Sequence, residues 1–150
     1  MADVLTVAQR RFNMSRIRGR DTKPELMLRL GLHARGLRFR LHRRDLPGCP
    51  DLVLARFTAV LFVHGCFWHG HGCPMFKLPL TRAKFWATKI EANRARDTRA
   101  LRRLAKSGWR TLIVWECALR GRSRRPVDAV IDEIIEWLGR TDPKGVVRGS

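Results

Sequence analysis

The chain has 150 residues, a length that suits one domain and leaves too little for two separate cores. It carries 31 Lys and Arg against 13 Asp and Glu, so its formal net charge of +18 favours a nucleic-acid partner, with an Arg-rich genome as the competing explanation. No apolar run approaches the roughly 20 residues of a membrane-spanning helix, and the first residues lack the apolar core of a signal peptide. We therefore expect a cytoplasmic, bacterial-type protein with no membrane partner.

Three regions are expected along the chain. Residues 1–20 are basic and have no sustained apolar period, which predicts a DNA-binding segment that orders on DNA. Residues 21–139 carry the periodic apolar patterns of a packed domain. Residues 140–150 are polar, and we expect them to form a loose tail.

The packed domain should begin with a helix from about Lys23 to Arg35, because Thr22-Lys23-Pro24-Glu25 has the form of a capping box with a proline in the first turn. Strands are expected at residues 37–41, 51–55, 59–64 and 109–116, and further helices at residues 82–106 and 127–138. Thr81 should cap the long middle helix. The apolar residues of that helix that should face inward are Phe85, Ile90, Leu101 and Leu104. This order predicts an α/β fold with a central mixed sheet flanked by helices.

Cysteine and histidine cluster in one short segment. Two thiols and three imidazoles lie within residues 64–73, and Cys117 follows the last predicted strand. Zinc takes four N or S ligands, so a closed structural site could be built from Cys66, His71, Cys73 and Cys117. Catalytic zinc and no metal at all are the alternatives, and Cys117 alone could be a small buried hydrophobe. Cys49 is isolated in a turn and stays outside the set.

One carboxylate stands at a position suited to a metal. Asp51 follows Pro50 directly before a buried strand, where it could bind Mg²⁺ or could be a turn residue that caps a loop. Nucleases with a PD-(D/E)-x-K pattern would place a second carboxylate and a lysine on the next strand. Here no Asp or Glu occurs between Asp51 and Glu91. Other metal ligands must therefore come from Glu25, Asp97 or Glu116, or from backbone carbonyls and water.

The missing carboxylate leaves histidine as the candidate general base. His69 and His64 lie beside the proposed metal sites, and an imidazole with a pKa near neutrality can take the proton from an attacking water. Glu25 or Asp97 could orient one of these rings. Each has an alternative role, Glu25 in the capping box and Asp97 in ion pairs with neighbouring arginines.

Large aromatic residues flank the same segment. Phe67 and Trp68 stand in a loop of Gly, His and Cys, and Trp86 lies early in the following helix. Apolar side chains in a basic setting can wedge between base steps, and unstacking costs less at a mismatch. Packing in the core is the alternative role, and it is stronger for Trp86 than for the loop pair.

The chain resembles the very-short-patch-repair (Vsr) DNA mismatch endonucleases. The matching strings are Asn13-Met14, Arg20-Asp21-Thr22, Leu46-Pro47-Gly48, Pro50-Asp51, the run from His64 to His69 and the run from Leu112 to Gly121. The Gly-Cys-Phe-Trp-His and Val-Trp-Glu-Cys-Ala-Leu strings are highly specific together. The resemblance implies a restriction-endonuclease-like fold, with residues 21–139 as the endonuclease domain. It also implies nicking of the strand bearing the T of a T·G mismatch, which arises by deamination of 5-methylcytosine.

The resemblance implies roles for individual residues. Structural Zn²⁺ would be held by Cys66, His71, Cys73 and Cys117. Catalytic Mg²⁺ would bind Asp51, with His69 as general base and with Glu25 and His64 in support. DNA contacts would be made by Phe67, Trp68 and Trp86, which intercalate, and by Met14, Lys89 and Asn93 near the mismatch. The implied partners are double-stranded DNA with a T·G pair and a MutL-type repair protein, and we expect the chain to act as a monomer.

The chain departs from the family pattern at four positions. Cys49 replaces an Arg, Val63 replaces a Thr, and Gly70 and Gly72 interrupt a run that is often histidine. The Cys49 departure could alter DNA contacts and hence the preferred sequence context. Two other functions stay open: a restriction-type endonuclease that cuts matched sites, and a non-catalytic zinc module that binds DNA.

Overall fold

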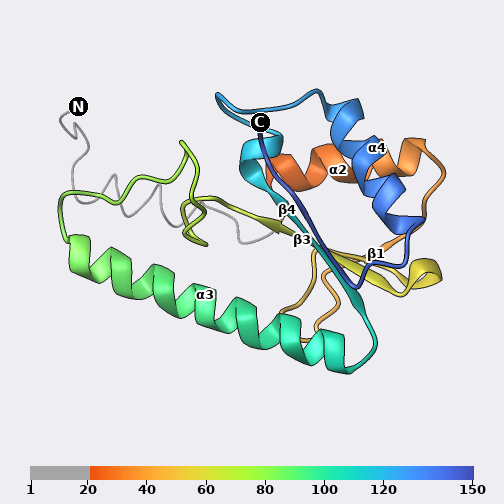
Figure 1. Cartoon of the computed structure of the whole chain (residues 1–150), viewed down its shortest axis with the longest axis horizontal. Coiled ribbons are helices and arrows are strands. Elements are labelled where there is room, and N and C mark those ends of the chain that lie inside the picture. Colours follow the sequence, from red (N-terminus) through yellow and green to blue (C-terminus); the bar gives the residue numbers. More distant parts are fainter. Residues whose placement is uncertain (1–20) are drawn as a thin grey trace.

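A computed structural model describes residues 21–150, so the basic segment of residues 1–20 and Met14 lie outside the described part of the chain. The helices are α2 (Lys23–Ala34), α3 (Ala83–Lys106) and α4 (Val127–Leu138), with short 3-10 helices η1 (Ala55–Phe57) and η2 (Glu116–Ala118). The strands are β1 (Arg40–Leu41), β2 (Leu52–Leu54), β3 (Ala59–His64), β4 (Arg110–Trp115) and β5 (Lys144–Val147). The described residues confirm the predicted α/β class, with a mixed sheet flanked by helices (Figure 1).

The sheet brings three polar chain segments to one edge. Strands β1, β2 and β3 are antiparallel neighbours, whereas β3, β4 and β5 run parallel. Because β3 and β4 pair in register at His64 and Trp115, their carboxyl ends meet at the same edge. Strand β2 runs the opposite way, so Asp51, directly before it, lies at that edge too. This edge carries the candidate site.

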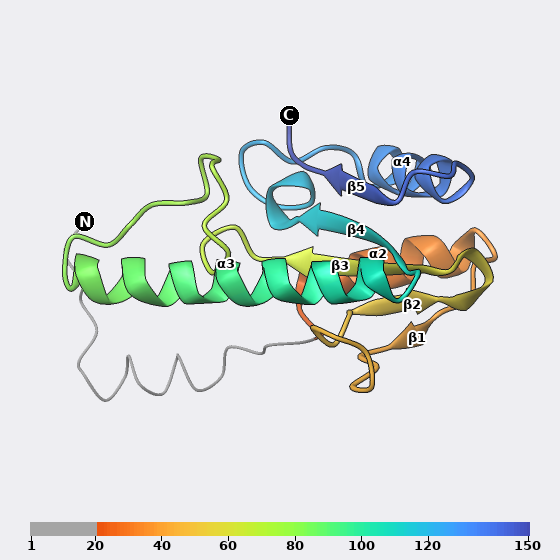
Figure 2. The same cartoon turned by 60° about the horizontal axis from the view of Figure 1, so that its bottom comes forward.

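Helices cover both faces of the sheet, with α2 and α4 together on one side and α3 on the other (Figures 1 and 2). Alternate strand residues supply the two cores, as the period of a strand requires. The core under α2 and α4 includes Leu28, Leu32, Leu52, Leu54, Leu61, Leu112, Val114, Ile131 and Ile134. The core under α3 includes Val53, Val60, Phe62 and Leu104. Each fully buried aliphatic side chain contributes about 1.5–3 kcal/mol through removal of apolar surface from water.

The amino-terminal half of α3 extends past the sheet toward the loop of residues 65–82 (Figure 2). Ile90 and Leu104 are buried as expected, but Phe85 is 43% exposed, so its predicted inward position is wrong. The first turns of α3 have no strand beneath them against which Phe85 could pack. Thr22 is the N-cap of α2 as predicted, but its side chain makes no capping bond; the predicted cap of α3 is wrong, since α3 begins after Arg82 and not after Thr81.

The loose tail expected at residues 140–150 is also wrong over its middle part. Residues Lys144–Val147 form β5 and pair with β4, and Val147 is 1% exposed. Gly145 makes this possible, because a Cβ there would lie 2.5 Å from Trp137 Nε1 and 2.7 Å from Leu112 Cδ1. The strand escaped prediction because it buries few side chains, too few for a periodic pattern.

Candidate functional site

A cavity of about 1180 Å³ opens at the edge of the sheet where β2 begins and β3 and β4 end. It lies between this edge and the side of α3 that bears Asn93 and Asp97. Its walls include all four predicted catalytic residues, Glu25, Asp51, His64 and His69. The fold therefore brings together groups that are spread over residues 25–69 of the sequence.

Asp51 is the carboxylate at the centre of this edge. Its Oδ2 accepts a hydrogen bond of 2.6 Å from the backbone N–H of Val63, on the neighbouring strand β3. Burial, with a smaller contribution from the charge of Glu25, raises the pKa of Asp51 to about 7 against the opposing effect of the Val63 N–H. A bound divalent cation would lower this pKa again, because an opposite charge favours the ionised carboxylate. The residues present therefore fit an oxygen-ligated metal at Asp51.

His69 is held by a second carboxylate. Its Nδ1 lies 2.5 Å from Asp97 Oδ2, which joins the loop after β3 to the middle of α3. Burial raises the pKa of Asp97, but the hydrogen bond and the charge of His69 outweigh this effect and hold that pKa below its ordinary value. An ionised Asp97 accepts a hydrogen bond from Nδ1–H, which leaves Nε2 as the ring nitrogen that can accept a proton.

His64 supports the ring of His69 from one side. The two imidazoles stack with centroids 3.9 Å apart and planes inclined by 1°. Burial, with a smaller contribution from the neighbouring His69, lowers the pKa of His64 to about 4, so His64 is neutral near pH 7. Stacking on a neutral ring fixes the plane of His69 without placing a positive charge beside it.

Glu25 lies on the other side of Asp51. It is 2% exposed, and its Oε2 accepts from the backbone N–H of Asp21 at 2.9 Å and from Arg29 Nη2 at 3.0 Å. Asp97, and not Glu25, is therefore the residue that orients His69. The capping-box alternative is wrong in its detail, since Glu25 bonds to Asp21 and not to Thr22.

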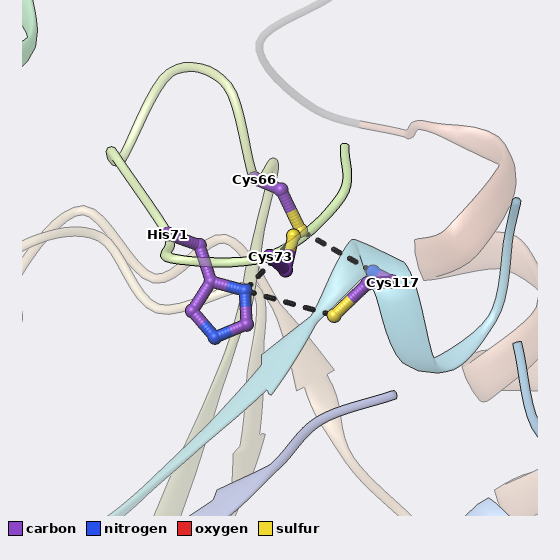
Figure 3. A group of neighbouring side chains, drawn as sticks. All are labelled: Cys66, His71, Cys73 and Cys117. Carbon is purple, nitrogen blue, oxygen red and sulfur yellow. Dashed lines mark hydrogen bonds between the residues drawn. The ribbon is translucent and has the colours of Figure 1, made fainter. Parts of the chain in front are cut away.

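The cysteine and histidine ligands meet as one cluster, as the sequence predicts. The ligand atoms of Cys66, His71, Cys73 and Cys117 lie within 4.8 Å of one another (Figure 3). His71 Nδ1 lies 3.6 Å from the Sγ atoms of both Cys66 and Cys117.

The surroundings of this cluster suit a cation. Cys66 Sγ accepts the backbone N–H of Cys117, and Cys117 Sγ accepts that of Gly149, each at 3.3 Å. Such donors favour thiolates, whereas burial raises the pKa of the Cys66 thiol. Burial lowers the pKa of His71, which leaves a neutral imidazole as a metal ligand must be. The set is compatible with zinc.

The sequence model of the DNA mismatch endonuclease Vsr family matches residues 2–75. DNA mismatch endonuclease Vsr of Escherichia coli is 49% identical over 138 residues, which cover 92% of this chain and 88% of that protein. The type II nicking enzyme V.XorIIP of Xanthomonas oryzae is 54% identical over 119 residues, 79% of this chain and 88% of the relative. The chain belongs to the Vsr family.

In this Vsr-family chain the three predicted intercalating residues form one cluster beside the cavity. The Phe67 ring centroid lies 5.2 Å from that of Trp68 and 5.5 Å from that of Trp86, and the two indoles are 5.7 Å apart. All three side chains are partly exposed. They pack on one another more than on the cores, so the core-packing alternative is weak for Trp86 as well.

Two further residues predicted to lie near a mismatch contact this cluster. Asn93 Nδ2 donates to the carbonyl of Trp68 at 3.0 Å, and Lys89 Nζ lies 5.8 Å from the centre of the Trp68 ring. Met14, the third, lies outside the described residues. No helix among residues 21–150 is long and apolar enough to span a membrane.

Sequence reasoning missed two groups around the Vsr site. Trp115 stacks on His71 with centroids 4.0 Å apart and meets His64 edge-on at 5.3 Å, so it connects the cysteine cluster with the stacked histidines. Arg29 and His42 contact Glu25 near Asp51. A tryptophan at a strand end and a lone histidine in a basic stretch carry no signal that separates them from ordinary packing residues.

Proposed function

We propose that this chain nicks duplex DNA beside the T of a T·G mismatch and so starts very-short-patch repair. One observation carries the proposal: an Asp97-oriented His69 shares a cavity with the buried carboxylate Asp51 and with Trp68 of the aromatic cluster. Hydrolysis and mismatch recognition thus share one surface. The family relatives are named for mismatch cleavage and for nicking, which agrees with this arrangement.

His69 acts as the general base in this proposal. Asp97 accepts a hydrogen bond from Nδ1–H and so fixes the tautomer, which leaves Nε2 to take the proton of the attacking water. His64 holds the ring plane by stacking. Proper placement of such a base contributes roughly 10²–10⁴-fold to a reaction rate.

Asp51 would hold a catalytic Mg²⁺, with its Oδ2 fixed by the Val63 N–H. When bound, magnesium activates water and stabilises the charge on the transferring phosphoryl group. Cys66, His71, Cys73 and Cys117 would hold a structural Zn²⁺ that ties the loop of residues 65–73 to the end of β4. In this reading zinc supports the site and takes no part in the proton transfer.

The aromatic cluster would enter the duplex at the mismatch. Phe67, Trp68 and Trp86 are the wedge, and Asn93 sets the position of Trp68 through its carbonyl. Lys89, over the Trp68 ring, would meet the phosphates or base edges beside the opened step. Met14 and the basic segment of residues 1–20 are proposed to contact DNA as well.

A row of cations on α3 would hold the flanking duplex. Arg96, Arg99, Arg103 and Lys106 recur every three or four residues, are exposed, and therefore share one side of the helix. None of these four pairs with an acid among residues 21–150, whereas Arg35, Arg43 and Arg125 do. Like charges left unpaired on one side of a helix repel, so a polyanion is the fitting partner.

Several broader features complete the proposal. A restriction-endonuclease-like arrangement agrees with the mixed sheet that presents Asp51 at its edge. We propose a monomeric, cytoplasmic enzyme, as expected from the sequence. A MutL-type repair protein is proposed as a partner on the family resemblance.

The test is a nicking assay with Mg²⁺ on duplexes that differ by one T·G pair. We expect a single nick on the T strand and no cleavage of the matched duplex. Asp51→Asn should lower the nicking rate by at least about 100-fold, as expected when a group that stabilises the transition state is removed. Double-strand breaks at matched sites would indicate a restriction-type enzyme instead. Salt-sensitive binding without nicking under any divalent metal would indicate a non-catalytic DNA-binding module.

A further inference from the structure

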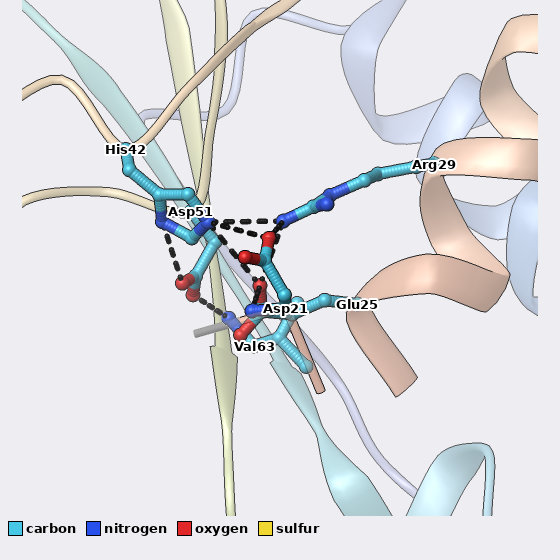
Figure 4. A network of polar contacts seen from close by, with 6 residues as sticks. All are labelled: Asp21, Glu25, Arg29, His42, Asp51 and Val63. Atoms are coloured by element: carbon cyan, nitrogen blue, oxygen red, sulfur yellow. Dashed lines mark hydrogen bonds and ion pairs between the residues drawn. The ribbon is translucent and has the colours of Figure 1, made fainter. Parts of the chain in front are cut away.

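A single nitrogen of Arg29 lies among three groups that could bind a metal. Arg29 Nη2 is 2.6 Å from Asp21 Oδ1, 3.0 Å from Glu25 Oε2 and 2.9 Å from His42 Nε2 (Figure 4). The ligand atoms of the three residues lie within 4.8 Å of one another, as they would around an ion. The guanidinium therefore stands where a cation would stand.

Burial makes a positive charge at this place necessary. Glu25 is 2% exposed, and the Arg29 side chain is 14% exposed. A buried carboxylate without a counter-charge is strongly destabilising, and breaking such a pair typically costs about 3–5 kcal/mol. Arg29 is held here although its Nε has no hydrogen-bond partner among the described residues. The contacts of Nη2 thus outweigh an unsatisfied donor.

The same contact fixes the tautomer of His42. Arg29 Nη2 has two hydrogens for three neighbours, Asp21, Glu25 and His42, and it cannot accept. An unprotonated His42 Nε2 can share one of these hydrogens, whereas a protonated Nε2 would face the guanidinium donor to donor. The ring proton is then on Nδ1, which faces Asp51 Oδ1 at 3.7 Å. This distance exceeds that of a hydrogen bond, so the N–H acts on the carboxylate through electrostatic attraction.

Asp51 is consequently constrained on both oxygens. Val63 N–H holds Oδ2, and His42 Nδ1–H faces Oδ1. The chain of contacts runs from Glu25 through Arg29 and His42 to Asp51 (Figure 4). Removing a group that orients a metal ligand in this way commonly lowers metal affinity by about 10–100-fold.

We infer that Arg29 and His42 are positioning residues for Asp51, and that Arg29 fills the place of a second divalent ion between Asp21, Glu25 and His42. The inference rests on the proposed function in taking Asp51 as the ligand of a catalytic divalent ion. Without DNA, Arg29 keeps a divalent ion out of this acid cluster and leaves Asp51 as the ligand for the catalytic ion: it neutralises the acids and lies against the imidazole that faces Asp51.

The test counts divalent ions on the zinc-loaded protein without DNA, by titration with Mn²⁺ followed by electron paramagnetic resonance. Wild type should bind one Mn²⁺ at Asp51. Arg29→Met should bind two, because the acid cluster is freed, whereas Arg29→Lys should bind one. A matched control is Arg35→Met, which removes a surface arginine that pairs with Asp128 and Asp132 and should leave one site.

His42 is tested by a pair of variants. His42→Leu should weaken Mn²⁺ binding by roughly tenfold, and His42→Gln should restore it to within about twofold, because an amide can accept from Arg29 and donate toward Asp51. If Arg29→Met fails to fold, the two His42 variants still test the inference. One Mn²⁺ with unchanged affinity in Arg29→Met, two in wild type, or unchanged affinity in His42→Leu would overturn the inference.

The readout separates this inference from the proposed function. Ion counting needs neither DNA nor a mismatch, so a protein that binds Mn²⁺ as expected but nicks no T·G duplex would defeat the proposed function alone. Nicking of the T·G duplex with wild-type ion binding in every variant would defeat the inference alone.

Discussion

Asp97 accepts a hydrogen bond of 2.5 Å from His69 Nδ1–H, and so a helix that crosses one face of the sheet fixes the tautomer of a ring in the loop at its edge. Replacing Asp97 with Asn would put an amide against Nδ1 and favour the tautomer with its proton on Nε2. We expect the rate of T·G nicking to fall by about 100-fold, the lower end of what a placed general base contributes, while the Kd for DNA stays unchanged. Single-turnover nicking measures the rate, and a binding titration measures the Kd.

The neighbouring exposed residue Thr98 supplies the control for this change. Its hydroxyl bonds to the carbonyl of Arg94 within α3, so Thr98→Ala should nick at the wild-type rate. A rate for Asp97→Asn within threefold of wild type would show that His69 does not need this partner.

Asp51 should make the stability of the protein depend on pH when no Mg²⁺ is present. Its folded pKa of about 7 lies above the ordinary value of 3.8 because of burial. A raised pKa contributes stability below the unfolded value that is lost as pH rises through the folded value. Between pH 4 and pH 8 we expect wild type to lose up to roughly 4 kcal/mol of unfolding free energy relative to Asp51→Asn.

Denaturant unfolding at several pH values measures this difference. Saturating Mg²⁺ should recover the stability of wild type at pH 8 and leave Asp51→Asn unaffected, since the cation favours the carboxylate. Parallel pH profiles for the two proteins would contradict the burial of an ionisable Asp51.

The four cysteines separate into a cluster and a free residue, which gives a matched pair of variants. Cys73→Ser removes a ligand of the cluster and should lower bound zinc from one ion per chain toward none, with a fall in Tm. Cys49→Ser changes an exposed thiol outside the cluster and should retain zinc and Tm. Zinc content by mass spectrometry, with thermal unfolding, decides between them. Full zinc in Cys73→Ser would contradict the assignment.

Trp68 should contribute more to the preference for mismatched over matched duplex than to the affinity for DNA in general. Stacking of a base on an aromatic ring is worth about 1–3 kcal/mol, so Trp68→Ala should reduce the preference for T·G over T·A duplex by roughly tenfold. Leu30→Ala, on a residue that is 74% exposed on α2, is the control. The ratio of Kd values for the two duplexes is the measurement, and an unchanged ratio in Trp68→Ala would exclude the wedge.

The cation row of α3 should increase the salt dependence of DNA binding. Each phosphate contact contributes about 0.9 to the slope of log K against log salt, so changing Arg99, Arg103 and Lys106 together to Gln should flatten that slope by up to roughly 3. Arg140→Gln is the control, because Arg140 already pairs with Glu136 and Asp142. A slope unchanged by the triple variant would place the duplex elsewhere.

The sequence predicted those parts of the site whose chemistry follows from the type of residue. Thiols and an imidazole for zinc, an acid before a buried strand and two histidines were candidates by residue type, with ordinary structural roles as alternatives, and the fold brings them to one edge. The α/β class followed from the order of periodic segments.

What escaped prediction depends on contacts across the chain. The partner of His69 was one of two acids until the α3 geometry selected Asp97. Arg29 and His42 stand 13 positions apart and meet only because α2 lies beside the edge of the sheet. Strand β5 buries mainly backbone and Val147, which leaves no periodic pattern to detect.

Strand β5 also has a consequence for how the protein is made. It pairs with β4, and Gly149 beyond it donates to Cys117 of the cysteine cluster. Until residues 144–149 are in place, one edge of the mostly apolar strand β4 is unpaired and the Cys117 thiol lacks the Gly149 N–H. Stalled or clipped chains that lack residues 144–149 should therefore be prone to aggregation and oxidation even though they contain every residue of the catalytic cavity.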